Sequence, residues 1–192
     1  MSVIRNITQK IKTHRQLRQS LRSHGINFRQ IIKSFKEYEK RKLDIREILS
    51  EDYSDDVLVD AYEYCMRKCS WDPATLPDSN VRDFLLSMLF QNEVEDGGIS
   101  QFLSNSSGDM CSETVSALKK IDANAAETLL KALDRFPNGI APKDREVRND
   151  LMDQMDEETI QYFDELDQTL FEQDTKAYVD FIHLHKDEFL RF

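Results

Sequence analysis

A short stretch rich in glycine constrains the fold of this chain more than any other feature. Three of the five glycines, Gly97, Gly98 and Gly108, lie between Glu93 and Gly108, just after an apolar helical pattern that ends in Phe90. A glycine pair after a helix is typical of a left-handed C-cap, because a Cβ would clash in that conformation. The pair therefore predicts that one helix stops there and that the chain turns sharply.

The remainder of this stretch, residues 93–108, which we call the glycine motif, predicts a short helix and a second stop. Residues 99–104 suit the short helix, and Gln101 and Asn105 share a face because they are four positions apart. The Asn-Ser-Ser-Gly sequence that follows is rich in residues that bond their own backbone. The motif is therefore expected to be mainly structural.

Catalysis is the alternative interpretation of the glycine motif. Its carboxylates, Glu93, Glu95 and Asp96, are of a type that suits acid–base chemistry. However, no histidine or lysine lies near them in the sequence, and the chain has no phosphate-binding loop. We therefore predict no catalytic residue, and an enzyme built on Glu93, Asp96, Gln101 and Asn105 stays the less favoured hypothesis.

The glycine motif also carries a resemblance to a known family. The matching positions are Glu93, Asp96, Gly97, Gly98, Ile99, Gln101, Phe102, Asn105 and Gly108. This pattern resembles the signature of the bacterial DNA-mimic protein family, and the resemblance covers about residues 54–190. Asp96 and Ile99 depart from the pattern, which usually has Asn and Phe there. The resemblance implies an acidic dimer that occupies the surface of a DNA-binding protein.

The spacing of apolar residues predicts an all-α fold. No stretch alternates apolar and polar residues with period two, so no significant β-sheet is expected. We predict a compact domain of about seven helices over residues 50–192 and a basic helical extension over residues 1–49. The apolar residues that define the helices of the domain fall within residues 58–69, 79–93, 112–121, 123–135, 147–155, 160–171 and 178–189.

The net charge of −10 conceals a division between the two parts of the chain. Residues 1–46 hold 13 Lys or Arg against 3 Asp or Glu, whereas residues 47–192 hold 13 against 33. Three interpretations of the basic extension remain open: a helical hairpin packed on the acidic domain or on a dimer mate, a contact with nucleic acid or an anionic surface, and a cleaved transit peptide. Direct nucleic-acid binding is expected only through residues 1–46.

Cysteine usage and hydropathy restrict the compartment and the cofactors. The three cysteines have no paired spacing, which argues for a reducing compartment. Cys65 and Cys69 are four positions apart, but His183 and His185 are distant, so we predict two buried thiols, no metal site and no cofactor. No apolar run approaches the ~20 residues of a membrane span, and no secretory signal follows the N-terminus. A cytoplasmic location is expected.

Asp167 is predicted to have a structural role. It lies seven residues after Ile160, within the apolar stripe of its helix. A carboxylate on the inner face needs donors, because an unpaired buried charge is very costly. Backbone N–H groups of the glycine motif are natural donors, so we expect Asp167 to hold this motif to the C-terminal half.

The remaining carboxylates carry the functional hypothesis. Residues 144–174 hold 12 Asp or Glu and 2 Arg. Acidic residues three or four positions apart on a helix lie ~5–6 Å from each other, which forms a fixed array of negative charge. The expected partner-binding face consists of Asp150, Asp153, Asp156, Glu157, Glu158, Asp164, Glu165 and Glu172.

We predict a non-enzymatic binding protein whose partner is a basic or DNA-binding protein, and a homodimer is a further expectation from the resemblance. An immunity-type inhibitor of a basic toxin or nuclease is the alternative in the same class. A solvated face that only increases solubility is the simplest explanation of such a charge run.

Overall fold

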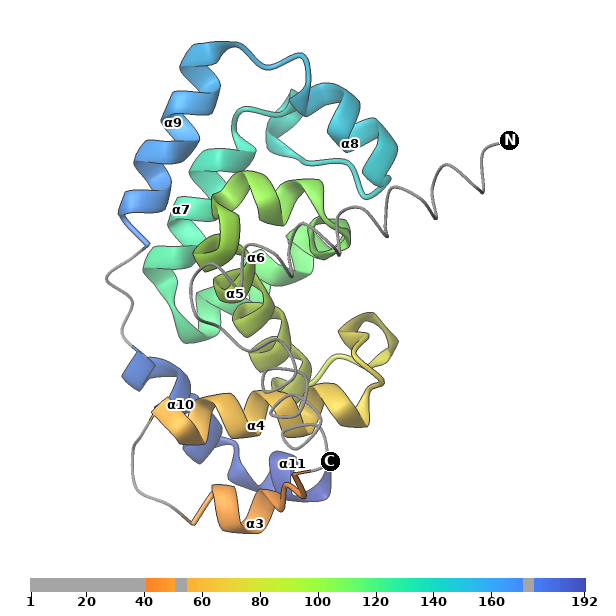
Figure 1. Ribbon diagram of the computed structural model, residues 1–192, viewed down its shortest axis with the longest axis vertical. Coiled ribbons are helices and arrows are strands. Elements are labelled where there is room, and N and C mark those ends of the chain that lie inside the picture. The colour runs from red at the N-terminus through yellow and green to blue at the C-terminus, as the bar shows by residue number, and fades with distance from the viewer. Residues whose placement is uncertain (1–40, 51–54, 171–174) are drawn as a thin grey trace, which may run out of the picture. The chain divides into compact units, whose positions relative to one another are not determined.

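The computed structural model describes residues 41–50, 55–170 and 175–192 and is all-α in these ranges (Figure 1). The basic helical extension expected over residues 1–49 is described only from residue 41 onwards. Ser54 and Asp174, at which the sequence also predicts helix N-caps, lie outside the described residues. The α-helices of the described part are α3 (Ile45–Ile48), α4 (Asp55–Lys68), α5 (Asn80–Ser104), α6 (Cys111–Ile121), α7 (Ala123–Leu133), α8 (Arg145–Met152), α9 (Glu157–Gln168), α10 (Thr175–Leu184) and α11 (Lys186–Arg191). Short 3₁₀ turns lie at Pro73–Thr75, Ser106–Met110 and Pro137–Gly139.

The described residues contain more helices than the seven expected for the domain, and two local features explain the difference. Asp44 begins the short helix α3, because its side chain accepts a hydrogen bond from the backbone N–H of Arg46. The C-terminal helix is divided at His185, which separates α10 from α11. Neither feature changes the fold class.

Helix α5 lies at the centre of the fold. It contacts α4, α6, α8, α9, α10 and α11, and Figure 1 shows the other helices grouped around its two ends. Ser79 begins this helix by accepting a hydrogen bond from the N–H of Arg82. Side chains are buried on nearly every side of α5, which is typical of a central helix.

Each half of α5 belongs to a different apolar cluster. The first half contributes Val81, Phe84, Leu85 and Met88 to a cluster with α3, α4, α10 and α11. The second half contributes Phe90, Val94, Ile99, Phe102 and Leu103 to a cluster with α6, α7 and α9. Edge-to-face aromatic pairs mark both clusters: Phe84 with Phe189 at 5.5 Å between ring centres, and Phe90 with Phe102 at 5.0 Å. The central helix thus joins two parts of one core.

The compact unit begins before the domain boundary expected at residue 50. It extends from Leu43 to Phe192, and Ile45, Ile48 and Leu49 are buried in the first apolar cluster. These residues are apolar at helical spacing and pack on the domain. From the sequence, these residues are predicted to belong to the basic extension, because the charge of the chain changes sign close to them.

Three apolar residues whose helical spacing served to predict the helices are exposed. Leu130 on α7, Val147 on α8 and Ile160 on α9 retain 38%, 50% and 41% of their accessible surface. On α9 the buried residues are Phe163 and Leu166, with Leu170 just beyond the helix. Periodicity alone places Ile160 on this stripe, but the packing starts one turn later.

Two predictions, that of two buried thiols and that of no membrane-spanning segment, can be compared with the described residues. Cys65 and Cys69 are buried free thiols, and burial raises the pKa of Cys65 to about 12. This agrees with the interpretation of two buried thiols. Among the helices of the described ranges, none combines the length and the apolar character that crossing a membrane requires.

Candidate functional site

The glycine pair bends α5 sharply. Gly97 has φ −170° and ψ 24°, and Gly98 has φ 77° and ψ −179°, so neither residue is helical. Phe90 and Phe102 would be ~18 Å apart along a straight helix, yet their ring centres are 5.0 Å apart. The predicted stop and turn are therefore confirmed.

The conformation of Gly98 differs in one respect from the predicted left-handed C-cap. Its positive φ agrees with the prediction, but its ψ is far from the value of about +47° that a left-handed helical residue has. The observed pair of angles belongs to a region that is essentially restricted to glycine. A Cβ at Gly98 would also overlap the carboxylate of Asp167. Both backbone conformation and space therefore require glycine here.

Glu93 is the polar centre of the glycine motif. Its Oε2 accepts hydrogen bonds from Gln101 Nε2 at 2.9 Å and from Asn105 Nδ2 at 2.7 Å, and its Oε1 accepts one from Ser107 Oγ at 3.0 Å. These bonds join the helical turn before the kink to the short helix and the turn after it. The motif residues Glu93, Gln101 and Asn105 therefore bond to each other, whereas Glu95 and Asp96 are exposed.

Asp167 on α9 contacts the glycine motif at the kink. Its Oδ1 accepts a hydrogen bond from the backbone N–H of Ile99 at 2.8 Å, which is the kind of contact expected from the sequence. Burial raises the pKa of Asp167, the Ile99 hydrogen bond opposes this rise, and the negative charge of Asp164 adds to it. Asp167 thus connects the acidic helix α9 to the turn in α5.

Arg148 on α8 is a central residue that is not among the residues predicted from the sequence. Its side chain is fully buried. The guanidinium donates to the carbonyl oxygens of Leu103, Asn105, Pro142 and Lys143, and Nη2 also pairs with Asp109 at 2.7 Å. These five bonds match the donor capacity of a guanidinium.

The signal for Arg148 was present in the sequence. It precedes Leu151, Met152 and Met155 at helical spacing and therefore lies in line with the apolar side of its helix. A cation in such a position must find acceptors, because a buried unpaired charge is costly. The prediction for residues 144–174 was based on their net negative charge, and it therefore named only carboxylates.

Gly108 makes room for the Arg148 side chain. A Cβ at Gly108 would lie 2.7 Å from the carbonyl oxygen of Leu103 and 2.9 Å from Nε of Arg148. Contacts this short essentially never occur for a real Cβ. The last glycine of the motif is therefore needed for the close approach of Arg148.

The predicted acidic face can be located on α8, on α9 and on the turn between them. Seven of its carboxylates are exposed: Asp150, Asp153, Asp156, Glu157, Glu158, Asp164 and Glu165. Glu172 lies outside the described residues. Among the residues that the structure describes, no cation forms an ion pair with any of these seven, which we call the acidic surface. Their charge is therefore directed to the solvent.

Helix capping contributes to the geometry of the acidic surface. Asp156 begins α9 by accepting a hydrogen bond from the N–H of Thr159 at 2.9 Å, and bonds from Thr159 lower the pKa of Asp156. Glu157 and Glu158 follow in the first turn, where the helix dipole favours negative charge. These carboxylates therefore stabilise the start of α9 as well as adding to the surface charge.

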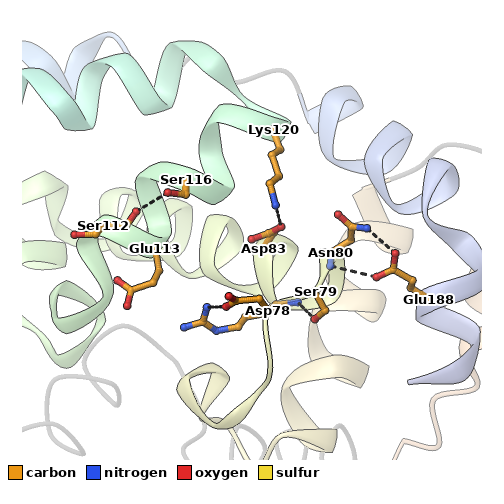
Figure 2. Close-up of a pocket in the computed structure, with 10 residues that line it drawn as sticks. Asp78, Ser79, Asn80, Asp83, Ser112, Glu113, Ser116, Lys120 and Glu188 are labelled. Atoms are coloured by element: carbon orange, nitrogen blue, oxygen red, sulfur yellow. Dashed lines mark hydrogen bonds and ion pairs between the residues drawn. The ribbon is translucent and has the colours of Figure 1, made fainter.

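A polar pocket of about 610 Å³ lies elsewhere in the fold, between the N-terminal ends of α5 and α6 and helix α11 (Figure 2). Figure 2 shows Lys120 bonded to Asp83 and Asn80 bonded to Glu188. At its rim, Arg82 donates to Asp78 at 2.8 Å. These carboxylates already have partners in the wall, and the lining residues lie outside the glycine motif. Arg82 Nε and Glu113 Oε2, whose residues also line the pocket, are buried without a hydrogen-bond partner among the described residues.

Comparison with known proteins identifies one similarity. The model of the DMP19-like protein family matches residues 74–186, a range that includes the glycine motif, Arg148, Asp167 and the acidic surface. The searches of curated proteins and of solved structures found no match.

Proposed function

The chain belongs to the DMP19-like protein family, and from this premise we propose that it is a non-enzymatic DNA-mimic protein. In this proposal the acidic surface occupies the DNA-binding surface of a basic protein. A homodimer would enlarge the negative field that such a partner meets. We also propose a cytoplasmic location, where DNA-binding proteins are available.

One observation carries the proposal: the carboxylates of the acidic surface are exposed, and the helices that carry them are held in fixed positions. Its seven carboxylates are exposed and form no ion pair with a cation among the described residues, and the helices beneath them are held by Arg148 and Asp167. Proteins that bind DNA present Lys and Arg at positions that match phosphates. A fixed array of carboxylates suits such a surface better than a mobile acidic tail, because less conformational freedom is lost on binding.

The bonding of the glycine motif supports a binding function over catalysis. Both carboxylate oxygens of Glu93 accept hydrogen bonds from neighbouring side chains, and Gln101 and Asn105 are used as their donors. A general base needs an oxygen within reach of the substrate proton. These three residues instead tie the turn together, which is a structural use.

The alternative of an immunity-type inhibitor uses the same acidic surface. A nuclease or toxin that binds nucleic acid is basic in its active-site cleft, so the electrostatic argument applies equally to it. The two functions differ in what the captured partner does to DNA.

The experiment is affinity capture with the full chain immobilised and a lysate of the source organism, at low and at high salt. The neutralised variant replaces Asp153, Glu157, Glu158, Asp164 and Glu165 by the corresponding amides. The matched control removes the same number of charges from exposed positions outside α8 and α9, namely Asp56, Asp78, Glu127, Asp180 and Asp187. All three proteins should keep the same helical circular dichroism spectrum, since the changed residues lie outside the core.

We expect the parent and the control to retain one basic protein at low salt and to release it at high salt, because screening weakens contacts between exposed charges. The neutralised variant should not retain it. Competition by duplex DNA would identify a DNA-binding partner, and inhibition of DNA cleavage would identify a nuclease. Equal retention by the neutralised variant would refute the proposal.

A further inference from the structure

The polar pocket between α5, α6 and α11 has no role in the proposed function. Its volume of about 610 Å³ is in the range of small-molecule sites, and all ten residues that line it are polar or charged. Figure 2 shows Glu113 and Lys120 from α6, Asn80 and Asp83 from the start of α5, and Glu188 from α11 around it. An apolar or aromatic ligand would find no apolar side chain in this lining, so a ligand of this pocket must be hydrophilic.

Two charged groups in the wall of the pocket have unused hydrogen-bonding capacity. Arg82 Nη1 donates to Asp78 at 2.8 Å, but Arg82 Nε is buried without a partner among the described residues. Glu113 Oε1 accepts from Lys143 at 2.7 Å, but Oε2 of the same carboxylate is likewise buried and unpaired within the described ranges. Buried polar groups without partners cost free energy. A ligand that accepts from the guanidinium and donates to the carboxylate would remove both costs.

Arg82 and Glu113 are close enough to influence each other electrostatically. Burial tends to raise the pKa of Glu113, but the hydrogen bond from Lys143 and the positive charges of Lys143 and Arg82 lower this pKa below its ordinary value. Glu113 is therefore ionised at neutral pH, and the unused donor and acceptor belong to a neighbouring cation and anion. A zwitterion, in which a carboxylate and an ammonium group are held a few bonds apart, complements such a pair.

The net charge of the lining restricts the ligand further. Four lining residues are negative and two are positive, namely Asp78, Asp83, Glu113 and Glu188 against Arg82 and Lys120. This excess of negative charge repels anions such as phosphates and nucleotides, and it favours a ligand with a net positive charge. An α-amino acid with a cationic side chain meets both conditions.

We propose that the pocket is a binding site for a free dibasic amino acid, such as arginine or lysine. Its α-carboxylate accepts from Arg82, its α-ammonium group donates to Glu113 Oε2, and its side-chain cation lies toward Asp83 and Glu188. Because Arg82 Nε and Glu113 Oε2 are not open to solvent, the ligand reaches them when these side chains rotate, a change that is common on binding. The inference does not depend on the proposed function, since neither α8 nor α9 contributes to the lining.

The test is isothermal titration calorimetry of the full-length chain with four small molecules. L-Arginine represents the proposed ligand, agmatine has the same cation without the carboxylate, L-citrulline has a neutral side chain, and L-glutamate has a net negative charge. The variant is Glu113→Gln, and the matched control is Glu127→Gln on α7, whose carboxylate also pairs with a lysine, at 3.0 Å, but lies outside the pocket. The neutralised variant of the acidic surface is a second control, because exposed carboxylates attract cations without a pocket.

We expect the parent, Glu127→Gln and the neutralised variant to bind L-arginine with the same affinity. Agmatine and L-citrulline should bind the parent about tenfold more weakly or worse, because each lacks one charge-assisted contact. L-Arginine should bind Glu113→Gln more weakly by a similar factor, and L-glutamate should not bind. The comparison of ligands on the parent tests the site even if Glu113→Gln fails to fold.

The absence of L-arginine binding by the parent would overturn the inference and would indicate that an ordered water bonds both groups. Equal binding of agmatine and L-arginine would exclude the contact with Arg82, and unchanged binding by a folded Glu113→Gln protein would exclude the contact with Glu113. Either result would overturn the zwitterion site. Loss of L-arginine binding in the neutralised variant would place the ligand at the acidic surface instead.

Discussion

Arg148 on α8 and Asp167 on α9 bind the same glycine motif, the first at the carbonyl oxygens of Leu103 and Asn105 and the second at the N–H of Ile99. The two helices that carry the acidic surface are therefore fixed to one turn by charged side chains. In the proposed function the residues of the motif do not contact the partner. They determine the geometry of a surface to which they do not belong.

Replacement of Arg148 by methionine should destabilise the protein by about 3–5 kcal/mol, because Asp109 and several carbonyl oxygens would lose their donor in a buried place. Arg148→Lys should recover little of this loss, since an ammonium lacks the planar array of donors. Denaturant unfolding measures the change. Arg145→Met is the control on the same helix, because Arg145 is exposed and makes one bond to the Ser104 carbonyl. Equal losses for Arg145→Met and Arg148→Met would contradict the central role of Arg148.

Gly98→Ala should cost about 2 kcal/mol or more, because it combines an unfavourable φ with a clash against Asp167. Gly139→Ala is the matched control. Gly139 has a similar φ of 70°, but its Cβ would only touch Asp134 at 3.4 Å. The control should therefore lose about 1 kcal/mol. Thermal unfolding of both variants tests this difference. An unchanged melting temperature for Gly98→Ala would show that the kink does not require glycine at this position.

The sequence was sufficient to predict those features that depend on local chemistry. The all-α fold follows from apolar spacing, and the sharp turn follows from the glycine pair. The contact of Asp167 was accessible because a carboxylate within an apolar stripe needs donors nearby. Each of these inferences uses residues that are close in sequence or have few choices of partner.

Features that depend on which surfaces meet in space could not be predicted in the same way. Arg148 lies in line with an apolar stripe, but its acceptors are distributed over residues 103–109 and 142–143. The exposure of Ile160 depends on where the packing of α9 against the core begins. Periodicity gives the direction of a side chain, and only tertiary structure shows whether another element covers it.

Glu93→Gln should destabilise the protein by about 1.5–3 kcal/mol. One side-chain oxygen would be replaced by an NH₂ group that faces the donors Gln101, Asn105 and Ser107 instead of accepting from them. Glu95→Gln is the control, since Glu95 is exposed two positions further on, and its effect should stay within about 0.5 kcal/mol. Chemical denaturation of both variants tests the prediction. A Glu93→Gln protein as stable as the parent would show that these three bonds contribute little.

Asp167 should give the stability a distinct dependence on pH. Its pKa is raised in the folded state, mainly by burial, so the folded protein binds more protons than the unfolded chain as the carboxyl titrates. The contribution of Asp167 should be most favourable below the ordinary carboxyl pKa of about 4 and should decline as pH rises through the higher pKa of the folded state. Asp167→Asn keeps an oxygen that can accept from the Ile99 N–H and does not titrate. The unfolding free energy of the parent minus that of Asp167→Asn should therefore decrease between pH 4 and pH 7, while the contributions of the other carboxylates cancel in the difference.

Urea unfolding at several pH values provides the measurement. Asp164→Asn is a second comparison, which should reduce the pH dependence because it removes a neighbouring negative charge. A difference that is constant with pH, or that increases, would show that burial does not disfavour the ionised form of Asp167.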